Sequence, residues 1–172
     1  MATGRKPAIV RKLSRDWIAG YVAGEIDREA SDLEVLDSSG KVAWIDLEQV
    51  KWVCYLRDLA GVSGDMSNPE RLLQKRFRAR PRMTGLWVRV ELMDHDLVEG
   101  IAANDASLVQ GAGLFLTPPD TRSNTQRIFI PLTAIENLEV VGLIGAATKR
   151  RSPTAEQEQP SLFAGEGEPE VL

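Results

Sequence analysis

The sequence of 172 residues contains a single cysteine, Cys54, and a single histidine, His95. An intramolecular disulfide is therefore excluded, and so is a zinc site built from several cysteines or histidines. His95 has no recognisable nucleophile that would complete a Ser-His-Asp arrangement. We therefore expect a protein that is not an enzyme and has no catalytic residues, no metal site and no cofactor.

The sequence also lacks a long apolar run and a strong excess of one charge. The weakly polar run at residues 140–147 is far shorter than the roughly 20 residues of a membrane-spanning helix. The first seven residues do not lead into a signal-peptide core. The net charge of −4 is modest, and the apolar content of 43% is that of an ordinary globular protein. We expect a cytoplasmic protein without a membrane partner.

The sequence does contain a series of short β-strand patterns, each rich in alternating or β-branched apolar residues and bounded by turn residues. The expected strands lie at residues 8–13, 17–24, 32–36, 42–45 and 50–56, and then at 86–92, 97–103, 114–116, 128–130 and 135–141. Gly20 lies inside the second of them, where a glycine indicates a bend or a close backbone approach. The pattern predicts an all-β fold.

One short helix is expected between the two groups of strands. Asn68 suits the N-cap, Pro69 suits the first helical position, and Pro81 would end the helix. We expect this helix over residues 69–78, inside a linker that spans residues 58–85. After residue 145 the composition shifts to Pro, Glu, Gln and Gly, which predicts a disordered tail over residues 146–172.

The two groups of strands repeat one apolar pattern. The segment 18–20 corresponds to 98–100, and both segments end in glycine. Four further apolar positions recur at a constant offset of 85 residues, because Ile45, Leu47, Val50 and Val53 correspond to Ile130, Leu132, Ile135 and Leu138. Four matches at one spacing favour an internal duplication. We expect a first domain at residues 8–57 and a second at residues 86–145.

Five short, bent strands with a glycine in the second strand and an apolar return strand resemble the Sm-like barrel. The second group, with its leading helix, resembles the bacterial RNA chaperone Hfq through Val98-Glu99-Gly100 and Ala134-Ile135-Glu136-Asn137-Leu138. The segments 100–105 and 113–124 also resemble a bacterial family of unknown function built from such barrels and sometimes found beside PilZ domains. The resemblance covers about residues 8–142 and implies two tandem Sm-like barrels.

The resemblance does not carry an RNA site with it. RNA-binding relatives have a Lys-His pair just before the matching Ala-Ile. This chain has Pro131, Leu132 and Thr133 there, and its first group has Asp46, Leu47 and Glu48. The residues that would contact uridine-rich RNA are therefore missing in one group and replaced by acidic residues in the other.

A basic cluster between the two groups is the strongest local charge feature; it consists of Lys75, Arg76, Arg78, Arg80 and Arg82. Its functional interpretation is a phosphate-contacting edge for RNA or for a nucleotide. Its structural interpretation is a solvated helix end, where cations suit the negative end of the helix dipole.

Two of these arginines also fit part of a nucleotide-binding motif. PilZ domains bind cyclic di-GMP with Arg-x-x-x-Arg, matched here by Arg76 and Arg80, followed by [Asp/Asn]-x-Ser-x-x-Gly. The second half is approached by residues 105–111, but its glycine arrives one residue late, at Gly111. A cyclic-dinucleotide-responsive regulator is therefore an alternative hypothesis with an incomplete motif.

The tail carries one apolar peptide, in which Gln159, Leu162 and Phe163 resemble the Gln-x-x-Leu-Phe sequence that docks bacterial proteins on the DNA polymerase sliding clamp. A glutamine amide in a polar pocket and a Leu-Phe pair in an apolar groove would provide the binding energy. The alternative is a chance match of five residues.

Other conspicuous residues have a structural interpretation. Asp94, His95 and Asp96 lie on an expected hairpin turn, and Cys54 is expected to be a small buried apolar residue. The four tryptophans fall in expected strands, where they are typical of a core or an interface; they are Trp17, Trp44, Trp52 and Trp87.

The sequence thus predicts a non-enzymatic binding or adaptor module. Small open barrels have exposed edge strands, which invite pairing with a second copy or with another protein. We expect a protein partner or self-association, with the sliding clamp as one candidate partner of the tail. A nucleic-acid-binding protein that uses the basic cluster at residues 75–82 is the main alternative.

Overall fold

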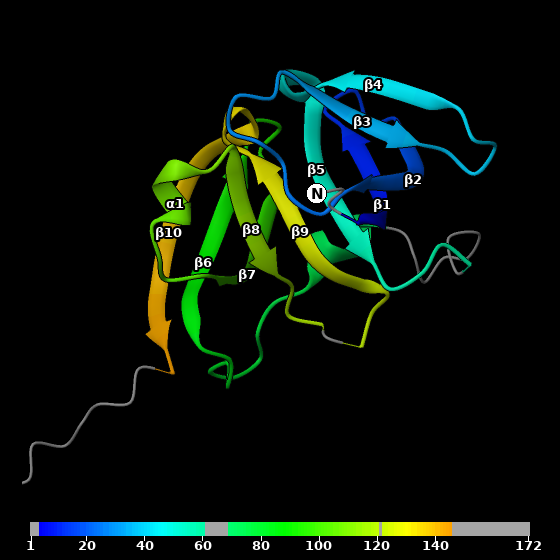
Figure 1. Ribbon diagram of the computed structural model, residues 1–172. Coiled ribbons are helices and arrows are strands. Elements are labelled where there is room, and N and C mark those ends of the chain that lie inside the picture. Colours follow the sequence, from blue (N-terminus) through cyan, green and yellow to red (C-terminus); the bar gives the residue numbers. More distant parts are fainter. Residues whose placement is uncertain (1–3, 61–68, 121, 146–172) are drawn as a thin grey trace, which may run out of the picture.

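The computed structural model describes residues 4–60, 69–120 and 122–145, and it contains one ten-stranded antiparallel sheet (Figure 1). The strands of the N-terminal half are β1 (Arg5–Lys12), β2 (Trp17–Ala23), β3 (Asp32–Leu36), β4 (Val42–Asp46) and β5 (Val50–Leu56). The strands of the C-terminal half are β6 (Gly85–Leu92), β7 (Leu97–Ala102), β8 (Gly113–Thr117), β9 (Thr125–Pro131) and β10 (Ile135–Ile144). Each strand expected from the sequence is present, with ends shifted by a few residues, so the all-β prediction is confirmed.

The strand order is β10-β6-β7-β8-β9-β5-β1-β2-β3-β4. In each half the fifth strand returns to pair with the first, β5 with β1 and β10 with β6. The halves then join edge to edge, because β9 pairs with β5. Two separately closed barrels, as expected from the sequence, are not what the structure contains. A half could close into a barrel if its own fourth and fifth strands paired with each other. Instead, the fifth strand of the N-terminal half, β5, pairs with the fourth strand of the C-terminal half, β9, so the sheet stays open.

Local details recur at equivalent places in the two halves. A short 3-10 helix precedes the fifth strand in each, η1 (Leu47–Gln49) before β5 and η4 (Leu132–Ala134) before β10. The turn after the first strand has one non-glycine residue with positive φ in each half, Arg15 at 73° and His95 at 65°. The correspondence therefore extends from the apolar pattern to the backbone conformation.

The buried apolar side chains form two clusters. The N-terminal cluster consists of Ala8, Val10, Val22, Leu33, Val35, Ile45, Leu47, Val50, Val53, Tyr55 and Phe129. The C-terminal cluster is built mainly on β6–β9, and it also takes in Ile9, Trp52, Cys54 and Leu56 from the N-terminal half. Each core is therefore completed by side chains of the other half.

The helix expected at residues 69–78 is shorter and of another type. A 3-10 helix, η3, covers Pro69–Gln74, and the chain then leaves it. The backbone N–H of Phe77 donates a hydrogen bond to the Glu99 carboxylate at 3.0 Å, and its ring packs edge-on against Trp87. These tertiary contacts replace the helical hydrogen bonds that the sequence pattern predicted. The α-helix of the described residues, α1, is instead a single turn at Ser107–Gln110.

The glycine at the centre of β2 has the role that the sequence indicates. A Cβ atom at Gly20 would lie 2.5 Å from the carbonyl oxygen of Leu36 on β3, and a Cβ atom at the equivalent Gly100 would lie 2.8 Å from that of Thr117 on β8. The second and third strands of each half therefore approach each other more closely than a side chain at this position allows.

We expect Gly20→Ala to lower the free energy of unfolding by about 1–3 kcal/mol, the usual cost of forcing extra volume into a packed site. Urea denaturation followed by tryptophan fluorescence measures this change. Gly142→Ala is the matched control, because a Cβ atom there meets no atom within 4 Å although Gly142 also lies in a strand. Equal stability of the two variants would contradict the prediction.

Candidate interaction edges of the sheet

The join between the halves, here called the seam, is the antiparallel pairing of β5 with β9. Val53 lies opposite Phe129 and Cys54 lies opposite Ile128. Phe129 is buried, and its side chain belongs to the N-terminal cluster although β9 belongs to the C-terminal half. Its ring lies 4.9 Å from that of Phe115, which in turn lies 6.2 Å from the ring of Tyr55. The seam thus places an aromatic side chain of one half in the core of the other.

Side chains on the opposite face of β5 contribute to the C-terminal core. Cys54 is fully buried there, and this burial raises the pKa of its thiol far above the ordinary value. The residue is therefore an inert apolar group, as the sequence predicts.

A buried ion pair crosses the same join. Lys51 on β5 is buried, and its ammonium group contacts two carboxylates on the turn between β6 and β7, Asp94 at 2.5 Å and Asp96. The turn predicted for these two aspartates is present. Both side chains are largely covered because they contact the buried Lys51 ammonium group, whereas His95 between them is well exposed.

The electrostatic environment of Asp94 combines opposing influences. Desolvation is the largest and raises the pKa of this carboxyl group. The hydrogen bond and charge of Lys51, together with backbone hydrogen bonds, outweigh it, so that the net pKa of Asp94 is lowered. The carboxylate is therefore ionised at neutral pH and balances the lysine charge.

The sheet ends in two open edges, which lie at opposite margins of the molecule (Figure 1). Among the described residues, β4 pairs with β3 alone and β10 pairs with β6 alone. The β4 edge exposes Val42 and Trp44, the latter with 67% of its surface accessible. The β10 edge exposes Leu138, Val140, Val141 and Leu143. Both edges therefore combine unpaired backbone with large apolar side chains.

Trp44 is exposed, unlike a tryptophan in a protein core. Trp52 is buried and Trp87 is partly buried, as expected, but Trp17 and Trp44 are more than half exposed. Ile45, next to Trp44, points into the N-terminal core. Because neighbouring residues of a strand face opposite sides, Trp44 points away from the core of its own half.

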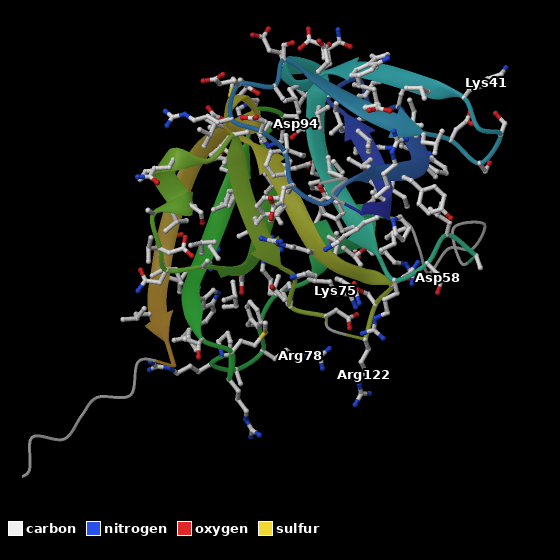
Figure 2. All side chains as sticks on the ribbon, viewed as in Figure 1. Lys41, Asp58, Lys75, Arg78, Asp94 and Arg122 are labelled. Carbon is white, nitrogen blue, oxygen red and sulfur yellow. The ribbon has the colours of Figure 1, made fainter. Side chains whose placement is uncertain are left out.

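The basic cluster is partly occupied by contacts within the chain. Lys75 forms an ion pair with Asp120 at 3.1 Å, Arg76 lies 3.7 Å from Glu99, and Arg80 donates a hydrogen bond to the Leu143 carbonyl. Arg78 and Arg82 are exposed. Figure 2 shows Arg78 at the lower end of the molecule and Asp94 at the upper end. A phosphate-contacting role for the cluster stays a prediction.

The remaining sequence-based candidates divide between the described residues and those outside them. The PilZ-like arginines, Arg76 and Arg80, make the contacts just given, and the Asp105 side chain accepts a hydrogen bond from the Ser107 backbone at the start of α1. The clamp-like peptide with Gln159, Leu162 and Phe163 and the whole tail lie outside the described residues.

One group of side chains has the composition of a metal site. Glu91, His95 and Glu136 place ligand atoms within 4.8 Å of one another, and no other such group occurs in residues 4–60, 69–120 and 122–145. His95 Nδ1 lies 3.2 Å from the Glu136 carboxylate. Two of the three side chains are exposed, and the contacts are also those of a surface ion pair.

A family model described as a family of unknown function (DUF6982) matches residues 4–142. The chain belongs to this family. The match spans both halves, so it includes the seam, the β4 edge and most of the β10 edge. The comparison with curated proteins and the comparison with solved structures gave no match. Within the part of the chain that the structure describes, no helix has the length and apolar character needed to cross a membrane.

The buried charges were not found by sequence reasoning, although the sequence contains a signal for each. Lys51 is the one charged residue in the apolar run 50–56, and Glu99 is the one charged residue in the apolar run 97–103. A charge inside a strand that is buried on both faces needs a partner. The acidic pair Asp94 and Asp96 was the available partner for Lys51.

We expect the double substitution Asp94→Asn and Asp96→Asn to lower the free energy of unfolding by about 3–5 kcal/mol, because it leaves a buried ammonium group without a counter-charge. Adding Lys51→Met to this variant removes the unpaired charge and restores most of the loss. Urea denaturation of the three proteins measures both steps. If the triple variant is no more stable than the double variant, the ion pair is not the cause.

The pH dependence provides a second readout of the same pair. The pKa of Asp94 is lowered in the folded state, so its contribution to stability is present above the ordinary aspartate pKa of about 3.9 and is lost as the pH falls through the folded-state value. The acid limb of the stability profile should therefore become shallower in the triple variant.

Proposed function

We propose that the protein is a non-enzymatic protein-interaction module that associates by β-strand addition at its two open sheet edges, with self-association as the primary mode. The observation that carries this proposal is the exposure of large apolar side chains on both terminal strands, Val42 and Trp44 on β4 and Leu138 and Val140 on β10. Exposed edges with unpaired backbone groups are templates for another strand.

Proteins that avoid edge pairing protect their terminal strands with lysine, proline, bulges or short strands. β4 is short, with five residues, and β10 has register shifts at residues 135–137 and 140–142, but neither strand contains lysine or proline. β10 has ten residues, and Val140 has 55% of its surface accessible. The register shift near Val140 changes the local twist but leaves Leu138, Glu139 and Val140 paired with three successive residues of β6. A regularly paired segment with two exposed apolar side chains, Leu138 and Val140, is therefore available to a partner.

We also infer that the two halves are Sm-like units that arose by internal duplication. Support comes from the same order of five bent strands in each half, the glycine at the centre of the second strand and the 3-10 turn before the fifth. An intracellular, cytoplasmic location belongs to the same proposal, and the free, buried Cys54 is consistent with a reducing compartment. This is an argument about architecture, and the interaction function rests on the edges alone.

We expect the purified chain to show a mass above that of the monomer in light scattering, rising with protein concentration. Replacing exposed edge residues, by Trp44→Lys with Val140→Lys, should reduce the mass to that of the monomer, because the charges oppose burial of the edges. Val109→Lys is the matched control, since Val109 is 75% exposed on α1 and lies on neither edge.

Thermal unfolding would show that all variants are folded. A wild-type chain that stays monomeric at every concentration tested would overturn the proposed function. The proposed function would also be wrong if Val109→Lys abolished association while the edge substitutions left association unchanged.

A further inference from the structure

A cavity of about 390 Å³ lies at one end of the seam, where β5 ends and β9 begins (Figure 1). Its wall is formed by both halves of the chain. The N-terminal half contributes Lys6 from β1, Tyr55 from β5 and Arg57, which follows β5. The C-terminal half contributes Gln126 and Arg127 from β9. Because each half supplies only part of the wall, the cavity is complete only when the seam has formed.

The charges around this cavity are of one sign. Three of its lining residues are cationic, Lys6, Arg57 and Arg127, and none of the described residues that line it is acidic. The chain as a whole has a net charge of −4, so this concentration of positive charge is opposite to the average of the molecule. A concave site lined by cations attracts and retains anions.

We propose that this cavity, here called the seam pocket, binds a small phosphate monoester through Lys6, Arg57 and Arg127. The phosphate group lies among the three cations, and the remaining volume holds the organic part of the ligand. The seam pocket is separate from the basic cluster at residues 75–82 and from the two open edges. The proposal therefore adds a ligand site to the proposed function and does not rest on it.

Arg127 is held in an orientation that leaves its hydrogen-bond donors available. Its guanidinium group lies 3.8 Å from the centre of the Phe115 ring. Stacking of this kind uses the face of the guanidinium group, whereas its N–H donors lie in the plane of the group. Within residues 4–60, 69–120 and 122–145, Arg127 forms no ion pair with a carboxylate. Its planar fork is therefore available for two parallel hydrogen bonds to a phosphate group.

Lys6 is restrained by packing against the backbone. Gly24 is buried in the wall of the pocket, and a Cβ atom at Gly24 would lie 3.1 Å from Lys6 Cε and 3.5 Å from Lys6 Cδ. The alkyl stem of Lys6 therefore lies along Gly24, and its ammonium group is the end that can reach a ligand. In the part of the chain that the structure describes, Lys6 has no carboxylate partner. An anion in the pocket would supply one.

Other parts of the wall are held in place by hydrogen bonds. The backbone N–H of Arg57 donates to the backbone carbonyl of Asn124 at 3.0 Å and to its side-chain oxygen at 3.2 Å. The hydroxyl group of Tyr55 donates to the Ala23 carbonyl at 2.8 Å. Burial raises the pKa of Tyr55 to about 12, although the nearby charge of Arg127 acts in the opposite direction. Tyr55 therefore stays neutral and adds no negative charge to the pocket.

The number of cations and the volume together favour a phosphate monoester. A monoester carries a charge of about −1.5 to −2 at neutral pH, whereas a carboxylate or a phosphodiester carries a single charge and would leave more of the positive charge unbalanced. The volume lies in the range of about 300–1,000 Å³ that is usual for small-molecule pockets. A bare phosphate ion would leave most of this volume to water.

Isothermal titration calorimetry of the full chain tests the ligand class, with phenyl phosphate and glycerol 3-phosphate as the probes. At least one of these two esters should bind more tightly than inorganic phosphate, because its organic part fills volume that the ion leaves to water. Phenol and glycerol should not bind, since they lack the charge that the pocket recognises.

Substitutions test the position of the site. Arg127→Gln and Lys6→Gln should each weaken binding of the ester by about tenfold or more, the usual loss for a charge-assisted hydrogen bond. Arg78→Gln is the matched control, because it removes the same charge from an exposed residue of the basic cluster, and it should leave the affinity unchanged. Thermal unfolding without ligand would show that the variants are folded. The ester should raise the Tm of the wild type and of Arg78→Gln, but not that of Arg127→Gln.

Several outcomes would overturn the proposal. If neither ester binds, or if Arg78→Gln abolishes binding while Arg127→Gln preserves it, the seam pocket is not the site. If inorganic phosphate binds as tightly as both esters, the ligand is the free ion and the monoester assignment is wrong. If an oligonucleotide without a terminal phosphate binds through Arg127 and neither ester does, the pocket is a nucleic-acid surface. Light scattering of the same proteins reports self-association independently, so a failure here is distinguishable from a failure of the proposed function.

Discussion

The burial of Phe129 in the core of the other half is the interaction on which the rest of the structure depends. Because the outer edge of β9 pairs with β5, the two five-stranded halves form one sheet. Because Phe129 and, in the other direction, Trp52 enter the opposite core, neither half completes its hydrophobic interior alone. The ion pair of Lys51 crosses the same join, so apolar burial and charge pairing act at one place. Since β5 and β9 pair with each other, β4 and β10 remain as the two open edges of the sheet.

Two buried charges determine where connecting segments lie. Glu99 on β7 accepts hydrogen bonds from the Phe77 backbone and from the Trp87 indole, and it thereby holds the segment after η3 against the sheet. Lys51 does the same for the turn between β6 and β7. Burying a charge carries a desolvation cost that several charge-assisted hydrogen bonds offset, so the net stabilisation is smaller than the contacts suggest. Their larger effect is positional, because an apolar contact would accept several registers and a paired charge accepts few.

The strands could be predicted because their information is local. Alternation and turn residues located all ten, and the glycines of β2 and β7 indicated the close approach to the third strand of each half. The seam could not be predicted in this way, because nothing in the pattern of β9 distinguishes pairing with β5 from closure on its own half. The length of the helix after Pro69 was overestimated for a related reason. The Glu99 carboxylate that accepts a hydrogen bond from the Phe77 backbone lies more than twenty residues away in sequence. Trp44 was assigned to a core or an interface by residue type, and only its orientation relative to Ile45 shows that it points outward.

The separation of the two seam strands along the chain has a consequence for synthesis. β5 ends at Leu56 and β9 begins at Thr125, so a ribosome completes the N-terminal half well before the strand that covers it exists. During that interval Val53 and Tyr55 lack the aromatic side chain that shields them in the finished fold. Neighbouring nascent chains on one messenger present the same exposed strand and, later, the same β9. A β9 strand of a neighbouring chain presents the same residues as the chain's own β9, so the time between synthesis of β5 and of β9 is also the time in which pairing between chains can compete with pairing within one chain.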